Sequence, residues 1–125
     1  MAQILIIDDD SDIRDFLEHT LNSAGHQTVT AAEGREGLNR FLRDPADLVI
    51  TDLFMPELDG LELIAGLRTR FPELAIIAMS GRTPNMLSVA RNMGSNEILQ
   101  KPFSSDELLA LVQNVLSKAG GRAGG

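Results

Sequence analysis

Five short runs with strand character, each followed by a stretch of helical periodicity, restrict the fold of this chain more than any other feature. The runs are Ile4–Ile7, Gln27–Ala31, Leu48–Thr51, Leu74–Met79 and Ile98–Gln100, of which the second is the least apolar. Between them, apolar residues recur at spacings of three and four, which is typical of a helix with one buried face. Strands alternating with helices predict an α/β fold, in which a parallel sheet carries helices on both faces.

The length of 125 residues fits a single domain. Apolar positions predict helices over 13–24, 38–42, 61–67 and 86–93. The run Ser104–Glu107 is a capping box that opens a last helix, with apolar positions over 108–116. We place the globular domain at residues 1–118 and a flexible glycine-rich tail at 119–125.

Composition excludes several classes of protein. The net charge of −7 argues against non-specific nucleic-acid binding, and the absence of cysteine excludes a disulfide framework. No apolar run is long enough to span a bilayer, and no secretory signal pattern is visible at the amino terminus. We therefore expect a soluble, cytoplasmic protein that neither contacts nucleic acid directly nor inserts into a membrane.

Functional groups stand at or directly after the carboxyl ends of four predicted strands. Asp8 and Asp9 follow the first strand, Asp52 the third, Ser80 the fourth and Lys101 the fifth. Strands of a parallel sheet end at one edge, where ligands bind in α/β folds. Clustered carboxylates repel each other, so this arrangement predicts a Mg²⁺ ion and a phosphoryl group beside the lysine and the hydroxyl.

These residues lie in four motifs that occur together in a known family. The motifs are Ile6–Asp10, Asp52–Gly60, Met79–Gly81 and Lys101–Phe103, the last with a Lys–Pro bond that suggests a cis peptide. In order and spacing, the chain resembles the receiver domain of two-component response regulators over roughly residues 1–117. The resemblance implies a doubly wound, flavodoxin-like (βα)5 fold with five parallel strands in the order 2-1-3-4-5.

The resemblance also implies a metal site. Asp9 corresponds to the residue that binds Mg²⁺ directly, and Asp8 to the acid that holds it through water. Asp52 and the backbone carbonyl of Phe54 are similar to the remaining protein ligands of the family.

A phosphorylation switch follows from the same resemblance. Asp52 corresponds to the phosphoacceptor, while Ser80 and Lys101 correspond to the groups that bind the phosphoryl group. The donor would be a phosphohistidine on a sensor histidine kinase or a histidine phosphotransfer protein. Such a domain catalyses only its own phosphorylation and slow dephosphorylation. It acts on a downstream protein through the face formed here by helix 86–93, strand 98–100 and helix 108–116.

Two positions depart from the usual pattern of the family. Ile98 stands where many members have an aromatic residue that rotates inward, and isoleucine cannot copy that movement. We therefore predict that the signal is a backbone shift over residues 80–84 and in the helix 86–93. Phe54 has no polar group to orient a water molecule, which predicts a long-lived phosphoryl group. Arg82 is expected to pair with that group or with Glu57.

Two alternatives use the same residues differently. An interaction module that works without phosphorylation would share the fold, but we would expect it to lack an acid, the hydroxyl or the lysine. A Mg²⁺-dependent phosphohydrolase with an aspartate nucleophile would use an acid pair such as Asp8 and Asp10, but the chain has no room for a cap domain.

Overall fold

Strands and helices alternate along the whole described chain. The computed structural model describes residues 2–54, 59–81 and 84–124, with the backbone alone over 84–87 and 119–124. In these ranges the elements are β1 (Gln3–Ile7), α1 (Ser11–Ser23), β2 (Gln27–Ala31), α2 (Gly34–Arg43), β3 (Leu48–Asp52), α3 (Gly60–Arg70), β4 (Ala75–Ser80), α4 (Pro84–Met93), β5 (Glu97–Gln100) and α5 (Ser105–Gly124). Each predicted strand and helix is therefore present.

The strands form one parallel sheet. Its order is β2-β1-β3-β4-β5, and every neighbouring pair runs parallel. This order confirms the predicted doubly wound α/β fold. The sequence of the strands reverses direction beside β1, so the loops that follow β1 and β3 are neighbours at the carboxyl edge.

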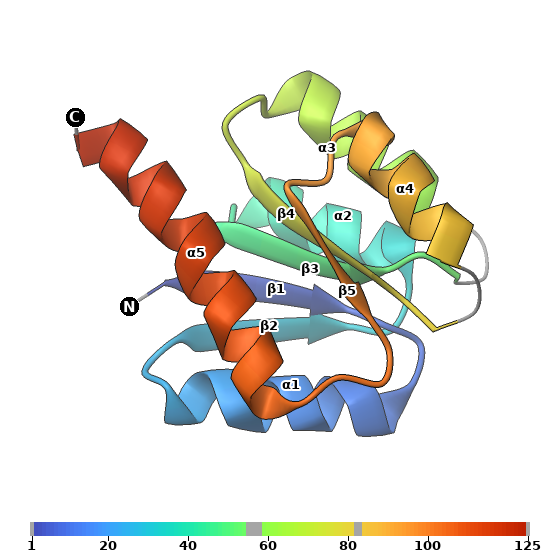
Figure 1. Cartoon of the computed structure of the whole chain (residues 1–125). Coiled ribbons are helices and arrows are strands. Elements are labelled where there is room, and N and C mark those ends of the chain that lie inside the picture. Colours follow the sequence, from blue (N-terminus) through green and yellow to red (C-terminus); the bar gives the residue numbers. More distant parts are fainter. Residues whose placement is uncertain (1, 55–58, 82–83, 125) are drawn as a thin grey trace.

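Helices cover both faces of the sheet, with α1 and α5 on one side and α2, α3 and α4 on the other (Figure 1). Alternation along β1 shows why: Ile4 and Ile6 belong to the core under α1 and α5, while Leu5 and Ile7 belong to the core under the other three helices. Successive strand residues point to opposite faces, so a strand buried on both sides must be apolar throughout.

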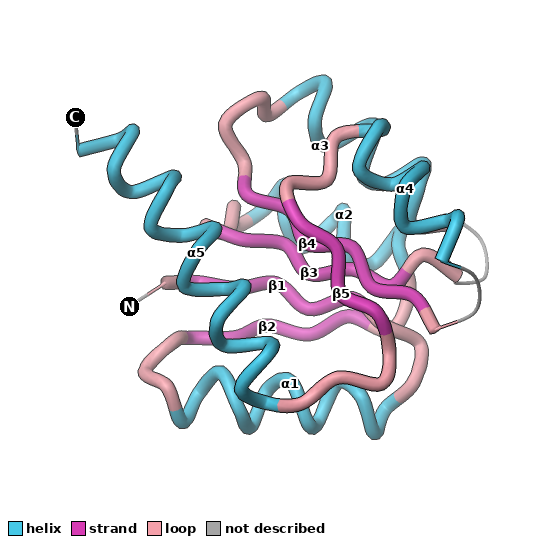
Figure 2. The backbone as a smooth tube through the Cα atoms, viewed as in Figure 1, coloured by secondary structure: helices cyan, strands magenta, loops and turns pink. Residues whose placement is uncertain are grey.

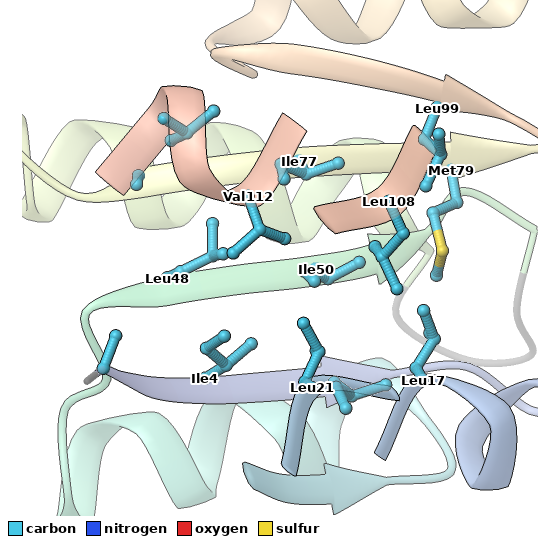
Figure 3. Packing of buried hydrophobic residues seen from close by; sticks show 14 residues of the cluster. Ile4, Leu17, Leu21, Leu48, Ile50, Ile77, Met79, Leu99, Leu108 and Val112 are labelled. Atoms are coloured by element: carbon cyan, nitrogen blue, oxygen red, sulfur yellow. The ribbon is translucent and has the colours of Figure 1, made fainter. Parts of the chain in front are cut away.

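The core under α1 and α5 is aliphatic. Side chains from four strands and both helices meet there, as Figure 3 shows for Ile50, Leu17 and Leu108. Each of these three side chains is fully buried. Burial of this kind supplies most of the free energy that holds such layers together, and it fixes the sheet edge on which the site is built.

Short polar side chains define where three helices begin. The carboxylates of Asp10 and Asp59 cap α1 and α3 by accepting hydrogen bonds from backbone N–H groups of the first turn. Ser104 and Glu107 exchange backbone-to-side-chain hydrogen bonds of 3.1 and 3.2 Å before α5, which confirms the predicted capping box. Gly94 ends α4 with a φ of 126°, a conformation that favours glycine.

The backbone of α5 continues as a helix through Gly124. The predicted boundary at residue 118 is therefore not marked by a change of secondary structure, although four of the seven residues after it are glycine. The flexible tail at 119–125 stays a prediction. No helix in the described part of the chain combines the length and the apolar character that crossing a bilayer requires.

Candidate functional site

The loops after the strands gather at one edge of the sheet (Figure 2). Parallel register brings the strand ends level: Ile7 of β1 lies beside Thr51 of β3, and Asp52 lies beside Met79 of β4. The residues that follow β1 and those that end β3 and β4 are therefore drawn together, as the sequence predicts.

Three carboxylates meet at this edge. Oxygen atoms of Asp8, Asp9 and Asp52 all lie within 4.8 Å of one another. Asp8 is completely buried and Asp52 is 6% exposed, whereas Asp9 is exposed. Two buried acids and one exposed acid thus form a small negatively charged site that opens to solvent on the side of Asp9.

Lys101 joins two of these acids. Its ammonium donates a hydrogen bond of 2.8 Å to Asp8 and lies 3.4 Å from an oxygen of Asp52. Lys101 stands 93 positions after Asp8 in the sequence, so the pair forms only because β1 and β5 are parallel and end at the same edge of the sheet. The Lys101–Pro102 peptide is cis, as predicted.

Burial and charge shift the pKa values of two of these groups. Burial, with repulsion from Asp8 and a smaller contribution from Asp9, raises the pKa of Asp52 from 3.8 to about 6, although Lys101 opposes the shift. Burial lowers the pKa of Lys101, but its hydrogen bond to Asp8 and the charges of both acids raise it more. At neutral pH Asp52 is therefore ionised and lies beside a cationic lysine.

Ser80 is buried at the end of β4. Its backbone carbonyl accepts a hydrogen bond of 2.9 Å from the N–H of Lys101, which holds the ends of β4 and β5 together. Every predicted side chain of the site thus lies at the same edge. The roles assigned to these residues, and the carbonyl of Phe54 as a metal ligand, stay predictions.

The two departures from the family pattern are placed only in part. Phe54 is half-buried against the core under α2, α3 and α4, and Ile98 packs on that core as well. Arg82, which we predict to pair with the phosphoryl group or with Glu57, lies outside the described residues, as does Glu57.

Sequence reasoning missed two residues that shape the site. Gly60 lies so close to the backbone of Asp52 that a Cβ atom would overlap its carbonyl oxygen, and only the turn signal Asp59–Gly60 pointed to it. Arg14 donates a hydrogen bond of 2.7 Å to the carbonyl oxygen of Asp8. A basic residue in the second turn of a helix after a strand end was the available signal.

The donor set suits a hard divalent cation. Carboxylate oxygens are the ligands that Mg²⁺ prefers, and the described part of the site contains neither sulfur nor imidazole. Repulsion among the acids is neutralised only in part by Lys101, so a cation would relieve what remains. By donor chemistry and spacing, Asp8, Asp9 and Asp52 fit the predicted Mg²⁺.

The family model of the response regulator receiver domain matches residues 4–113 of this chain. The chain belongs to the response regulator receiver family. It is therefore a phospho-accepting signalling module of a two-component system, and not a conventional enzyme. The fold, the acidic site and this match agree with the family that the sequence motifs suggested.

Similar proteins agree with this membership. The chain is 36% identical to the response regulator MprA of Mycolicibacterium vanbaalenii over 94% of this chain and 51% of that protein. It superimposes on a receiver domain protein of Clostridium thermocellum with a TM-score of 0.89 and 30% identity, covering 94% and 96% of the two chains. For NtrX of Brucella abortus the TM-score is 0.93 at 30% identity, covering 98% and 28%. The receiver spans about half the length of the curated relatives that it matches.

Proposed function

We propose that this receiver accepts a phosphoryl group on Asp52 from a phosphohistidine, in a reaction that depends on Mg²⁺. The observation that carries the proposal is the position of Asp52, a buried carboxylate with a lysine ammonium 3.4 Å away and two further acids beside it. A carboxylate held in this way can act as a nucleophile, while the lysine stabilises negative charge on the incoming phosphoryl group.

The proposed transfer conserves atoms and charge in a simple way. An oxygen of Asp52 forms a bond to phosphorus as the phosphorus–nitrogen bond to the donor imidazole breaks, and that imidazole keeps the bonding electrons and takes up a proton. Lys101 and the hydroxyl of Ser80 then hold phosphoryl oxygens. Hydrolysis of the acyl phosphate by water returns Asp52 to its carboxylate.

In this proposal, Asp8, Asp9 and Asp52 would hold Mg²⁺ together with the carbonyl of Phe54. When bound, Mg²⁺ would supply positive charge that offsets the charge of the acids and of the phosphoryl group. The chain's own contribution is the fixed spacing of the carboxylates, which have oxygens within 4.8 Å of one another.

The partners follow from the proposed chemistry. The donor is a sensor histidine kinase or a histidine phosphotransfer protein in the cytoplasm, and the output is a downstream protein or domain that reads the α4–β5–α5 face. The added negative charge attracts the hydroxyl of Ser80, the last residue of β4, and the ammonium of Lys101, the residue after β5. The net charge of −7 supports signalling through protein contacts without direct binding of nucleic acid.

The phosphohydrolase alternative has less support. It needs Asp10 as a partner of Asp8, but the Asp10 carboxylate accepts a hydrogen bond of 2.9 Å from the N–H of Asp12 and caps α1. The other alternative, an interaction module that works without phosphorylation, is distinguished from our proposal by the acetyl phosphate experiment below.

Intact mass after incubation with acetyl phosphate tests the proposal. We expect a single phosphoryl adduct on the parent chain, with none when Mg²⁺ is removed and none on an Asp52→Ala variant. An adduct that persists in that variant would assign the chemistry to another residue. A parent chain that takes up no phosphoryl group with Mg²⁺ present would favour the phosphorylation-independent module.

The side chain of Phe54 is expected to lengthen the life of the phosphoryl group. Because phenylalanine offers no hydrogen bond to an attacking water, a Phe54→Asn variant, whose amide can orient that water, should lose its phosphoryl group faster, by up to roughly a hundredfold, the lower end of what general acid–base assistance contributes. The decay of the adduct, followed by intact mass after removal of acetyl phosphate, measures this rate. Phe54→Leu is the matched control, and an equal rate in the Asn variant would contradict the prediction.

A further inference from the structure

The three carboxylates of the site are not held equally. Asp8 accepts hydrogen bonds at both of its carboxylate oxygens, from the backbone N–H of Asp10 at 2.9 Å and from Lys101 at 2.8 Å. Asp52 lies beside the same lysine. The carboxylate of Asp9 accepts no hydrogen bond from any residue in the described ranges, and it is exposed. Its position therefore depends on its backbone.

The backbone beside Asp9 is held by Arg14. The guanidinium donates a hydrogen bond of 2.7 Å to the carbonyl oxygen of Asp8, and this carbonyl belongs to the peptide that links Asp8 to Asp9. On its other side Asp8 donates its N–H to the carbonyl of Ala31, at 3.2 Å. Because a peptide is planar, fixing its oxygen also fixes the direction in which the Asp9 residue leaves it.

Arg14 is itself anchored. It stands in the second turn of α1, half-buried, and the backbone N–H of Arg14 donates to the carbonyl of Asp10, which caps that helix. Glu36 of α2 lies close enough for the charge of Arg14 to lower the pKa of that acid, after larger effects of a hydrogen bond from Ala32 and of Arg40. The helix therefore fixes the backbone position from which the guanidinium reaches the carbonyl of Asp8.

We propose that Arg14 is a positioning residue for the metal site, which fixes the Asp8–Asp9 peptide and thereby aims the Asp9 carboxylate at the cation. This inference rests on the proposed Mg²⁺-dependent function. It deepens that function by adding a residue that touches neither the metal nor the phosphoryl group.

The sign of the effect separates positioning from simple electrostatics. Arg14 is positively charged, so by Coulomb's law alone its removal would let Mg²⁺ bind more tightly. Positioning predicts the opposite, because residues that orient metal ligands typically contribute roughly ten- to hundredfold to metal affinity. A loss of affinity on removing a neighbouring cation therefore cannot come from charge.

Calorimetric titration of the full chain with Mg²⁺ tests the inference. Arg14→Met keeps most of the apolar stem and removes the donor, and we expect it to bind Mg²⁺ roughly tenfold more weakly than the parent. Arg14→Lys restores a charged donor and should recover part of the loss. Arg40→Met is the matched control, because it removes an arginine near Glu36 that makes no contact with Asp8. This control should bind Mg²⁺ at least as tightly as the parent.

Equal or tighter binding by the folded Arg14→Met variant would overturn the inference while leaving the proposed function intact, provided that the parent binds Mg²⁺ and forms its adduct. A parent that binds no Mg²⁺ would overturn both. Far-UV circular dichroism checks that each variant is folded. If Arg14→Met does not fold, Arg14→Leu, which also lacks a donor, carries the same expectation of weaker binding, and affinity equal to that of the parent would overturn the inference.

Discussion

Replacing Asp52 with asparagine is expected to stabilise the metal-free protein at pH 7 to 8 by about 1–3 kcal/mol while it abolishes phosphorylation. The reason is the cost of keeping Asp52 ionised: burial and the neighbouring Asp8 raise the pKa of this acid to about 6. An amide of nearly the same shape carries no charge and escapes that repulsion. The substitution also removes the attraction between Asp52 and Lys101, and this loss offsets part of the gain in stability.

The stability difference between the parent and Asp52→Asn should depend on pH. The pKa of Asp52 is about 6 in the folded chain and 3.8 as its ordinary value. Between these two values the folded chain holds a proton that the unfolded chain has released. The free energy of unfolding of the parent should therefore fall as pH rises through this window, relative to that of Asp52→Asn. Near pH 4 the charge of Asp52 should cause little difference between the unfolding free energies of the two proteins.

Urea unfolding followed by far-UV circular dichroism, with a chelator present, measures the difference. The chain contains neither Trp nor Tyr, so a circular dichroism signal is more suitable than intrinsic fluorescence. Asp44→Asn is the control, because Asp44 is exposed and far from the lysine in the fold. A stability difference that does not change between pH 4 and pH 8 would show that repulsion at the site is not its source.

Replacing Lys101 with methionine should have a large effect of the opposite sign. The substitution leaves the buried carboxylates of Asp8 and Asp52 without their shared cation. Removing one partner of a buried ion pair costs about 3–5 kcal/mol, and because the lysine side chain is 21% exposed we expect about 2–3 kcal/mol here. The loss should appear in metal-free buffer at neutral pH, above the pKa of about 6 that Asp52 has in the parent chain.

Mg²⁺ should return part of the stability that Lys101→Met loses. A divalent cation supplies the charge that the lysine no longer provides, so added Mg²⁺ should raise the melting temperature of this variant more than that of the parent. Lys118→Met, at an exposed position of α5, is the matched control and should behave as the parent does. Equal Mg²⁺-induced shifts in all three proteins would contradict the proposed metal site.

A double substitution tests whether the two effects share one cause. If Lys101 matters mainly because it faces ionised Asp52 and Asp8, then Lys101→Met should cost less when Asp52 is already asparagine. Unfolding free energies of the four proteins in metal-free buffer form the complete cycle. Strict additivity would mean that the lysine stabilises the fold through its packing or its pairing with Asp8, and not through the charge of Asp52.

Much of the fold could be predicted from local patterns. Residues three and four apart repeat in α1 and α3, and strand alternation in β1 sends Ile4 and Leu5 to opposite cores. The capping box at Ser104 is equally local. These signals depend on neighbours within one segment, so they survive without knowledge of the rest of the chain. The strand order came from the resemblance of the motifs to a family.

The sequence by itself determined which elements form and which residues stand at the carboxyl ends of the strands. Only the tertiary structure decided that Lys101 bridges Asp8 and Asp52, that burial raises the pKa of Asp52, and that Arg14 holds the Asp8–Asp9 peptide. The physical reason is that periodicity is a property of each segment alone. Ion pairing and desolvation depend on distances between segments that are far apart in the chain and meet only once the layers have packed.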